Sequence, residues 1–448
     1  MKKIIIFGLA RSGVAAIDFL SKLNYQIQIH DDKRGSIDKI LSYPNIIKCY
    51  DIDDIKWDNI DYLLLSPGVP LYFPTPHKIV KLANQKNIKI ISDIEIFYNI
   101  FPKQNYIGIT GTNGKSTVTT LTSNIFSDSK KEFDFGGNIG KAVFDMSILP
   151  ENSHYILELS SYQLDLLFHT NFKIAILLNI TPDHLARHGN FENYILSKIR
   201  VFQNQQKGDF SIIGIDNKNT SKIYQTLKSD CNFRAKLIPF SIKNILDQGF
   251  AIKDQIIYEN GKEIANLQNK ILIKGDHNLE NILASFIAGY LSGINIDSII
   301  YSISKFTGLK HRMQFVRNIK NANFINDSKA TSLEATIMAI KNFDNIHLIL
   351  GGEIKDDDFN ILSNYKNHIS KCYLIGAATD KLYNILSNQI SCQKSYDLKS
   401  AIDDSYRIVK NSKEKASILL SPAAASFDQW KDFEERGEFF IDYVERLL

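Results

Sequence analysis

One stretch constrains the fold of this chain more than any other: YIGITGTNGKSTVTTLTSNIF, residues 106–126. Its beginning, NYIGIT, has the apolar composition of a buried strand, and the run from Ser116 to Phe126 has the spacing of a helix. A glycine turn that leads from a strand into a helix points backbone N–H groups at an anion. The stretch therefore predicts a phosphate-binding loop in an α/β domain, although the usual G-x-x-x-x-G-K-[ST] spacing is two residues longer.

The residues of this loop predict ATP binding rather than a structural turn, because a helix cap needs a glycine but not a Gly-Lys-Ser-Thr run. We expect Lys115 to bind the terminal phosphates, and Ser116 or Thr117 to offer a hydroxyl oxygen to Mg²⁺. The expected ATP-binding residues of the loop are Gly111, Thr112, Asn113, Gly114, Lys115, Ser116 and Thr117.

Three more side chains stand out in the residues that follow the loop. Glu158 ends the apolar strand YILE, where an unpaired carboxylate is costly to bury, so it is either a cation ligand or a solvated acid. His184, in TPDHLARHG, is either a satisfied loop residue or a ligand. Lys198 lies in an apolar helical run, which by itself predicts a surface lysine whose carbon chain covers apolar neighbours.

The N-terminal block has the order strand, glycine turn, helix, strand and acid that is typical of a Rossmann unit. Gly8 and Gly13 stand at the outer positions of G-x-G-x-x-G, but Ala10 replaces the middle glycine, so the backbone cannot approach a pyrophosphate as closely. The block is therefore either a site for a nucleotide-type ligand, with Asp31 or Asp32 near a sugar hydroxyl, or a plain α/β turn.

A further buried strand, LLLSPGVP, ends in a Pro-Gly turn. It places Ser66, Pro67 and Gly68 at a carboxyl end, which is where α/β sheets bind ligands.

The remaining chain predicts two more regions of structure. Short alternating runs between about residues 210 and 270, with Asn-Gly at 260–261, predict hairpins, and KGDHNLENILASFIAGYLSG predicts a helix. After these, FINDS, HLILGG, CYLIG and ASILLSP predict the strands of another α/β unit. We therefore expect an α/β protein of three domains, 1–102, 103–308 and 309–448, which are Rossmann-like, of P-loop ATPase type and Rossmann-like in that order.

Composition excludes several other classes of protein. The net charge of +4 is spread thinly over 448 residues, unlike the basic face of a nucleic-acid-binding protein. The four cysteines are far apart and form no C-x-x-C pair, which favours reduced thiols in the cytoplasm. The apolar run in MKKIIIFGLARSG is too short for a signal peptide, and no run is long enough to span a membrane. We expect no nucleic acid, no membrane insertion and a monomer.

At the level of whole motifs, the chain resembles the Mur ligases, the ATP-dependent amide ligases of peptidoglycan precursor synthesis. The motifs GITGTNGKST, LELSSYQLD, LLNITPDHLARHG, GDHNLENILA, TGLKHRM, NDSKAT and LLSPAAASFDQWKDFEERG occur in the family's order and cover nearly the whole chain. The resemblance is closest to the members that add D-glutamate to UDP-N-acetylmuramoyl-L-alanine. It implies ATP, Mg²⁺, an acyl-phosphate intermediate and domains that bind the UDP precursor, ATP and the amino acid.

The resemblance also implies roles for individual residues. Lys115, His184 and Lys198 would be catalytic, and the metal ligands would be Ser116, Glu158, His184 and a carbamylated Lys198. Four more residues would contact ATP: Asn278, Asn281, Arg312 and Asp327. The UDP precursor would contact Arg11, Ser12, Asp31, Asp32, Lys33, Ser66, Gly68, Asn138, Ser160 and Ser161. D-Glutamate would contact Lys329, Thr331, Lys355, Ser426 and Phe427.

Three departures from the family pattern and three alternatives remain open. Ala10 and Lys33 replace a glycine and an arginine, which affects the expected details of UDP recognition, and Ser332 stands where asparagine is frequent. The alternatives are a related ligase that adds another amino acid, a P-loop kinase or NTPase, and a nicotinamide-dependent oxidoreductase. The missing middle glycine speaks against the oxidoreductase, and a longer phosphate loop would favour the kinase.

Overall fold

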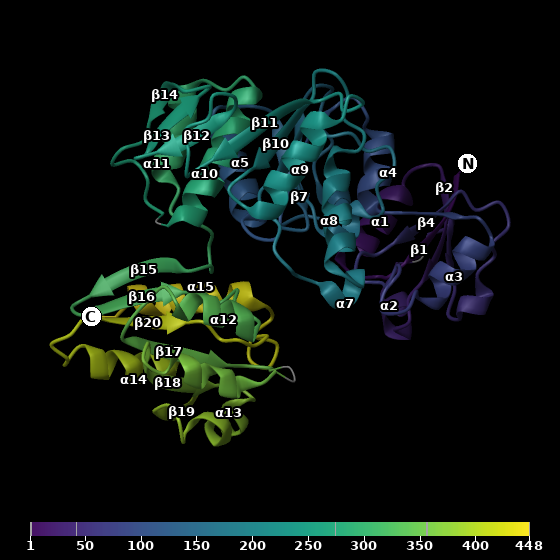
Figure 1. Ribbon diagram of the computed structural model, residues 1–448. Helices are drawn as coiled ribbons and strands as arrows, with labels where there is room; N and C mark the ends of the chain where they lie inside the picture. The colour runs from purple at the N-terminus through teal and green to yellow at the C-terminus, as the bar shows by residue number, and fades with distance from the viewer. Residues whose placement is uncertain (1, 42, 274, 355–356, 448) are drawn as a thin grey trace. The chain divides into compact units, whose positions relative to one another are not determined.

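The computed structural model describes residues 2–41, 43–273, 275–354 and 357–447. It contains two compact units, Met1–Phe306 and Thr307–Leu448. The first unit holds two β-sheets and the second unit holds one, and helices pack against all three (Figure 1). The α/β class predicted from the sequence is confirmed, whereas the domain boundaries at 102/103 and 308/309 stay predictions.

The first sheet is parallel throughout and has the strand order β3-β2-β1-β4-β5. Its order reverses between β1 and β4, and such a switch point is where doubly wound sheets bind ligands. The strands are β1 (Lys2–Phe7), β2 (Tyr25–His30), β3 (Ile46–Lys48), β4 (Tyr62–Leu65) and β5 (Lys89–Ile91). The helices are α1 (Arg11–Leu20), α2 (Arg34–Asp38), α3 (Lys78–Gln85) and α4 (Asp93–Ile100).

The turn between β1 and α1 needs both of its glycines. Gly8 has a φ of +92°, and a Cβ placed on it would lie 2.5 Å from the Cβ of Ser66. A Cβ on Gly13 would lie 2.1 Å from the carbonyl oxygen of Gly8. The outer glycines of the predicted fingerprint therefore close a tight turn against β4.

The central sheet has nine strands in the order β14-β13-β12-β11-β10-β9-β6-β8-β7. It is parallel from β7 to β12 and antiparallel in the final meander. The strands are β6 (Asn105–Thr110), β7 (Phe133–Gly137), β8 (His154–Glu158), β9 (Ile174–Leu177), β10 (Phe210–Gly214), β11 (Lys236–Ser241), β12 (Phe250–Lys253), β13 (Ile256–Glu259) and β14 (Lys262–Asn266). The helices of this region are α5 (Lys115–Asp128), α6 (Ser161–Leu164), α7 (Leu185–His188), α8 (Phe191–Ile199), α9 (Lys218–Ser229), α10 (Asp276–Leu291) and α11 (Ile296–Lys305).

The two edges of the central sheet differ in their covering. At one edge, β14 exposes Lys262 and Glu263. At the other edge, the chain after β7 folds back, so that the N–H of Gly137 donates to the carbonyl oxygen of Lys141 at 2.9 Å. The amine of Lys141 also pairs with Asp134 at 2.9 Å.

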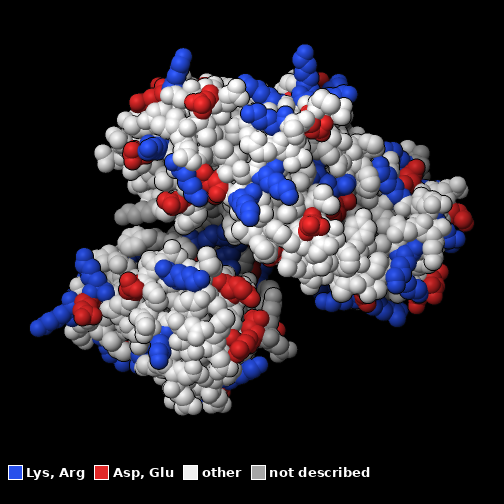
Figure 2. Space-filling model, in the orientation of Figure 1, with Lys and Arg blue, Asp and Glu red and all other residues white. Residues whose placement is uncertain are grey.

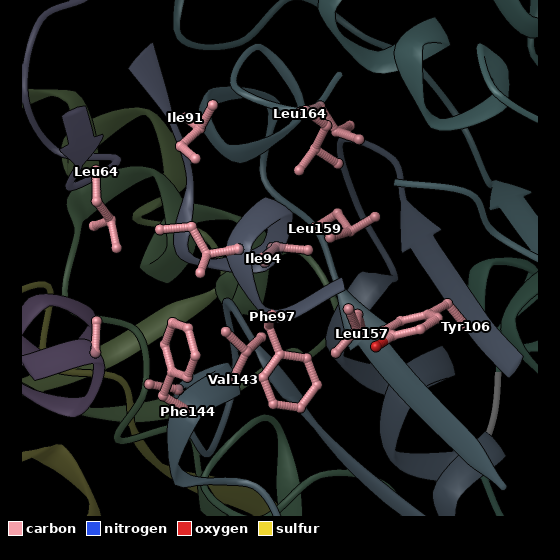
Figure 3. Packing of buried hydrophobic residues seen from close by; sticks show 14 of the residues in the cluster. Leu64, Ile91, Ile94, Phe97, Tyr106, Val143, Phe144, Leu157, Leu159 and Leu164 are labelled. Atoms are coloured by element: carbon pink, nitrogen blue, oxygen red, sulfur yellow. The ribbon is translucent and has the colours of Figure 1, made fainter. Parts of the chain in front are cut away.

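One continuous hydrophobic core joins the first and central sheets. Helix α4 lies between them, and Phe97 on this helix contacts Phe144 and Tyr155 with ring centroids 5.6 and 5.0 Å apart (Figure 3). Leu64 and Ile91 from the first sheet and Leu157 from the central sheet belong to the same buried cluster. This shared core explains why residues 1–306 form one compact unit.

The second unit contains a six-stranded sheet in the order β15-β16-β20-β17-β18-β19, parallel except for the pair β15 and β16. The strands are β15 (Gln314–Ile319), β16 (Ala322–Asn326), β17 (Ile346–Gly351), β18 (Ile369–Ile375), β19 (Cys392–Tyr396) and β20 (Ala416–Leu420). The helices are α12 (Leu333–Ile340), α13 (Thr379–Leu386), α14 (Leu398–Val409) and α15 (Phe433–Glu445). Hydrophobic clusters pack on both faces of this sheet.

The hairpin prediction for residues 210–270 is only half right. The part after residue 250 is the antiparallel meander, with Asn260 and Gly261 between β13 and β14. The part before it is a parallel crossover in which α9 joins β10 to β11. Asn217 caps α9, and apolar residues at 223, 224 and 227 have helical spacing, so the helix was recognisable.

Figure 2 shows the charged side chains on one face of the structure. Lysine and arginine are interspersed with aspartate and glutamate over the visible face of the molecule (Figure 2). No helix within the described parts of the chain has both the length and the apolar composition needed to cross a membrane.

Candidate active site

The predicted phosphate loop lies between β6 and α5, as expected. Gly114 caps the helix in the left-handed region, with a φ of +85°, and Lys115 is the first helical residue. Ser116 and Thr117 are buried in the first turn. The first N–H groups of a helix have no acceptor within the helix and carry its positive end, so this turn can receive phosphate oxygens.

Asn179, two residues after the end of β9, bonds to the backbone of the phosphate loop. Its backbone carbonyl oxygen accepts from the N–H of Thr112 at 2.9 Å, and its Oδ1 accepts from the N–H of Asn113 at 2.9 Å. The hydroxyl of Thr112 also lies 3.0 Å from the hydroxyl of Tyr194 on α8. Residues that follow the neighbouring strand β9 thus hold the loop in place.

Lys198 corrects the interpretation that its local sequence favours. It is not a surface lysine, because only 1% of it is exposed. Its Nζ donates to the carbonyl oxygen of Gly111 at 2.8 Å and lies 4.8 Å above the ring of Tyr194. Burial, with the nearby charge of Lys115 as a second cause, holds the pKa of Lys198 well below its ordinary value. The uncharged amine is therefore favoured beside the phosphate loop.

Glu158 lies at the end of β8 and is 2% exposed. Its Oε1 accepts from the amide of Asn138 at 2.7 Å, whereas its Oε2 is buried without a hydrogen-bond partner. A buried carboxylate oxygen without a partner is costly, and a bound cation removes that cost. The donor type fits Mg²⁺, although the described residues contain no cluster of three or more histidine, cysteine, aspartate or glutamate side chains that could hold a metal.

His184 begins the one-turn helix α7 in the left-handed region, with a φ of 52°. Its ring lies 5.3 Å from that of Tyr162, which also stacks on His188 at 5.5 Å. His188 is buried, and its Nε2 lies 2.9 Å from the hydroxyl of Ser161. Burial lowers the pKa of His188 to about 4, so its ring is neutral at pH 7.

The residues predicted to contact the UDP precursor lie near the carboxyl ends of strands in two sheets, the first sheet and the central sheet. Asp31 accepts from the N–H groups of Leu9 and Lys33 at 2.7 and 2.8 Å, and Ser66 donates to the carbonyl oxygen of Gly8 at 2.9 Å. Further residues of this set are distributed as follows: Ser12 on the first turn of α1, Asp32 paired with His77, Gly68 exposed after β4, and Ser160 capping α6.

Arg11 connects the first sheet's side of this set with the central sheet's side. Its guanidinium donates to the carbonyl oxygens of Gly140 and Gly137 at 2.6 and 3.3 Å, so it holds the segment that carries Asn138.

The predicted adenine contacts on α10 differ in exposure. Asn278 is half-buried in the first turn, whereas Asn281 is buried with its Oδ1 against Gly114. A Cβ on Gly114 would lie 2.2 Å from that oxygen, so the side chain of Asn281 packs directly against the phosphate loop. Between them, Glu280 lies 3.4 Å from the amide nitrogen of Asn179, and burial raises the pKa of Glu280 to about 7.

Within the second unit, the predicted residues gather at the carboxyl ends of β16 and β20. Asp327 is buried and accepts from the hydroxyl of Ser421 at 2.8 Å, and burial raises its pKa to about 6. Lys329 and Thr331 follow β16, Ser426 is buried after β20, and Arg312 and Phe427 are exposed. Lys355 lies outside the described residues.

Arg436 on α15 joins the loops after these two strands. It is 1% exposed, and it donates to the hydroxyl and carbonyl oxygens of Ser328 and to the carbonyl oxygen of Ala424 at 3.0, 2.9 and 3.1 Å. Burial lowers its pKa to about 10. The strand-end loops of the second unit thus share one buried guanidinium.

Comparison with known proteins identifies the family. Residues 109–289 match the Mur ligase middle domain. The UDP-N-acetylmuramoylalanine–D-glutamate ligase of Rickettsia bellii is 41% identical, with 97% of this chain and 96% of the relative covered. The ligase of the same name from Rickettsia prowazekii is 40% identical, with 99% of this chain and 98% of the relative covered. The chain belongs to the Mur ligase family.

Solved structures show the same fold for this Mur ligase. The UDP-N-acetylmuramate-alanine ligase of Thermotoga maritima has a TM-score of 0.55 at 15% identity and covers 99% of both chains. A UDP-N-acetylmuramoyl-L-alanyl-D-glutamate–2,6-diaminopimelate ligase has a TM-score of 0.56 at 16% identity, over 86% of this chain and 87% of that chain. The family resemblance and the α/β fold class expected from the sequence are confirmed.

Sequence reasoning missed several residues that shape the site of this Mur ligase. Asn179 could have been found, because it is the first polar residue after an apolar strand. Nothing in the local sequence distinguishes Tyr194 or Arg436, since their partners come from distant parts of the chain.

Proposed function

We propose that this Mur ligase joins D-glutamate to UDP-N-acetylmuramoyl-L-alanine at the expense of ATP, and releases ADP and phosphate in peptidoglycan precursor synthesis. The observation that carries the proposal is the match, over nearly the whole chain, to relatives named for that reaction. The phosphate loop supports the ATP-dependent part independently, because it offers a helix start and Lys115 to an anion.

The chemistry follows from the weakness of a carboxylate as an electrophile. A carboxylate oxygen of the precursor attacks the γ-phosphorus of ATP, the bond to the bridging oxygen breaks, and ADP leaves. The amine nitrogen of D-glutamate then attacks the acyl carbon, the amine gives up a proton, and phosphate leaves as the amide forms. No protein nucleophile is needed, so positioning and charge neutralisation supply the catalysis.

Lys115 is proposed to neutralise the charge of the phosphoryl group during transfer. The Nζ of Lys115 donates to the carbonyl oxygens of Gly111 and Thr112 at 2.9 and 2.8 Å, so its side chain lies folded along the loop. The remaining proposed ATP contacts are the other loop residues with Asn278, Asn281, Arg312 and Asp327.

Mg²⁺ would be held by Ser116, Glu158 and His184, and it would supply positive charge to the phosphates. Carbamylation would make Lys198 a further ligand: its uncharged nitrogen bonds to the carbon of CO₂ and releases a proton, which leaves an anionic carbamate. Burial supports this step, because only the uncharged amine is nucleophilic and burial disfavours the ammonium form.

The proposed contacts of the two organic substrates come from different regions of the sequence. The proposed precursor contacts are Arg11, Ser12, Asp31, Asp32, Lys33, Ser66, Gly68, Asn138, Ser160 and Ser161. The proposed D-glutamate contacts are Lys329, Thr331, Lys355, Ser426 and Phe427. The enzyme would act as a monomer in the cytoplasm, where ATP and its nucleotide-linked substrate are present.

A panel of amino acids tests the proposal. Phosphate release from ATP is measured with and without UDP-N-acetylmuramoyl-L-alanine, and with D-glutamate, L-glutamate, L-alanine, L-lysine or meso-diaminopimelate. We expect release only when precursor and D-glutamate are both present. Equal turnover with L-glutamate or another amino acid would refute the substrate assignment, and turnover without precursor would indicate a kinase or NTPase.

A further inference from the structure

Arg187 connects two segments of the first unit that come from different sheets. Its guanidinium donates to the carbonyl oxygens of Pro67 and Phe73 at 3.1 and 3.3 Å, and to the carbonyl oxygen of Val69. All three acceptors belong to the loop of residues 67–73, which follows β4 of the first sheet. Arg187 itself lies on α7, after strand β9 of the central sheet.

Arg187 also contacts the surroundings of His184. The guanidinium lies 5.0 Å above the ring of Tyr162, and that ring lies 5.3 Å from the ring of His184. The N–H of Arg187 donates to the carbonyl oxygen of His184 at 2.9 Å. Arg187 therefore contacts the backbone of His184 directly and its ring through Tyr162.

The segment of residues 184–189 has little stability of its own. Helix α7 has a single turn, and it begins with His184 in a left-handed conformation that is unfavourable for a residue with a Cβ. Its position must therefore come from contacts outside the segment. Beside the bonds of Arg187, the ring of Phe73 packs where a Cβ on Gly189 would lie 2.7 Å away.

The acceptors of Arg187 are backbone carbonyls rather than carboxylates, so the bonds depend on the conformation of the loop. A planar guanidinium can donate to several such oxygens at once, whereas a lysine amine is a single point of charge. A change in the 67–73 loop would alter these bonds, and Pro67 lies between Ser66 and Gly68, both proposed precursor contacts.

We infer that Arg187 is a positioning residue that couples occupancy of the 67–73 loop by the precursor to the placement of His184 beside the phosphate loop. The inference rests on the proposed function, because it takes the ligand of the loop to be the UDP precursor. Precursor binding would then raise the affinity for a magnesium–nucleotide complex, and nucleotide binding would raise the affinity for precursor by the same factor.

Calorimetry on the full-length protein tests this coupling without turnover. The Kd of UDP-N-acetylmuramoyl-L-alanine is measured with Mg²⁺ alone and with Mg²⁺ and saturating ADP. We expect a wild-type coupling factor of about 5-fold or more, in the usual range for linked sites. Arg187→Lys keeps the positive charge but loses the planar guanidinium with its several N–H donors. It should reduce the coupling factor to about 1 while each ligand still binds alone.

Arg200 provides a matched control, because it also donates to backbone carbonyls, those of Leu164 and Leu167 at 2.9 and 2.6 Å, but does not bond to the 67–73 loop. Arg200→Lys should keep the coupling factor. Phe73→Ala is a second test variant that removes the ring packed on Gly189, and since Phe73 is partly exposed the fold should persist. It should lower the coupling even if Arg187→Lys does not fold.

The possible results separate the inference from the proposed function. Wild-type protein that binds both ligands without coupling would overturn the inference alone, as would unchanged coupling in Arg187→Lys or, if that variant does not fold, in Phe73→Ala. A loss of coupling in Arg200→Lys equal to that in Arg187→Lys would also overturn it, because the effect would then not depend on the bonds to the 67–73 loop. Wild-type protein that does not bind the precursor at all would overturn the proposed function and the inference with it.

Discussion

Lys115 and Lys198 donate to the same acceptor, the carbonyl oxygen of Gly111, at 2.9 and 2.8 Å. Two positive charges so close to one another repel, and the more deeply buried nitrogen is the one that loses its proton more easily. Burial, with the charge of Lys115 as a second cause, lowers the pKa of Lys198, which favours its uncharged form, and Lys115 is the lysine that we propose to bind phosphate. Two lysines with different proposed roles thus share one carbonyl oxygen.

We expect Lys115→Ala to lower kcat/KM by at least about 100-fold, because a preorganised charge on the transferring group is worth several kcal/mol. Phosphate release in the presence of both substrates measures the loss, and circular dichroism should show an unchanged fold. A variant with normal turnover would exclude Lys115 as the group that neutralises phosphate.

We expect Lys198→Ala to lose activity that a short carboxylic acid, such as acetate, partly restores. The substitution leaves space beside Thr110, Gly111 and Tyr194, and a small carboxylate there would replace the anionic oxygen of a carbamate. Turnover is measured against acetate concentration, with chloride at the same ionic strength as control. A Lys198→Ala variant that is active, and whose turnover does not depend on acetate, would exclude the carbamate.

We expect Glu158→Gln to raise the Mg²⁺ concentration for half-maximal activity by about 10-fold or more. An amide cannot provide the negative charge that the unpartnered Oε2 offers to a cation. Titration of activity with Mg²⁺ at saturating ATP measures the shift. Glu151→Gln is the control, since Glu151 is an exposed partner of Lys103 and its loss should leave the titration unchanged.

We expect Gly114→Ala to weaken ADP binding by about 10-fold or more. The φ of +85° strains any residue with a Cβ, and the new atom would meet Oδ1 of Asn281 at 2.2 Å. Gly293→Ala is a matched control, because Gly293 has a φ of +74° but open space where the Cβ would be. If both variants bind ADP equally well by calorimetry, the packing of Asn281 under the loop has no role.

We expect acid to destabilise the second unit through His347 on β17. It is buried with its Nδ1 2.8 Å from the hydroxyl of Tyr373, and burial lowers its pKa to about 4 from 6.5 in the unfolded chain. Between these values the unfolded state binds the extra proton, so stability is full above pH 6.5 and is lost as the pH falls toward 4.

Hydrogen exchange of residues 346–351 at pH 7, 6 and 5 measures this effect, after correction for the intrinsic exchange rates. The population of the open state should rise up to about tenfold per pH unit from His347 alone. His347→Gln should make the dependence shallower, whereas His277→Gln, at an exposed position, should not. An unchanged slope in His347→Gln would exclude this histidine as the cause.

Sequence predicts well those parts of the molecule that depend on near neighbours. The phosphate loop, the strand before it and the helix after it are encoded in consecutive residues. The glycines of the loop also mark the positions that need a backbone conformation open to glycine. The same holds for the Gly8 turn and for the strand that ends at Glu158. The missed helix α9 also had a local pattern, but its polar composition resembled that of the neighbouring hairpins.

Contacts between distant residues could not be predicted in this way. Lys198 is buried because Thr110, 88 residues earlier, and Gly111 accept its hydrogen bonds, and no local pattern reports that. The family resemblance supplied the role that the local physics of the helix did not. Arg187 is a similar case, since its three carbonyl acceptors lie in the loop after a strand of the other sheet.

The two edges of the central sheet have a consequence for how the protein behaves at high concentration. An edge strand exposes unpaired backbone groups, and a flat apolar edge invites a strand from another molecule to add to it. Here Lys262 and Glu263 place charges on one edge, and the segment that returns through Lys141 occupies the other. Nine strands can therefore lie side by side in this enzyme without promoting aggregation by strand addition.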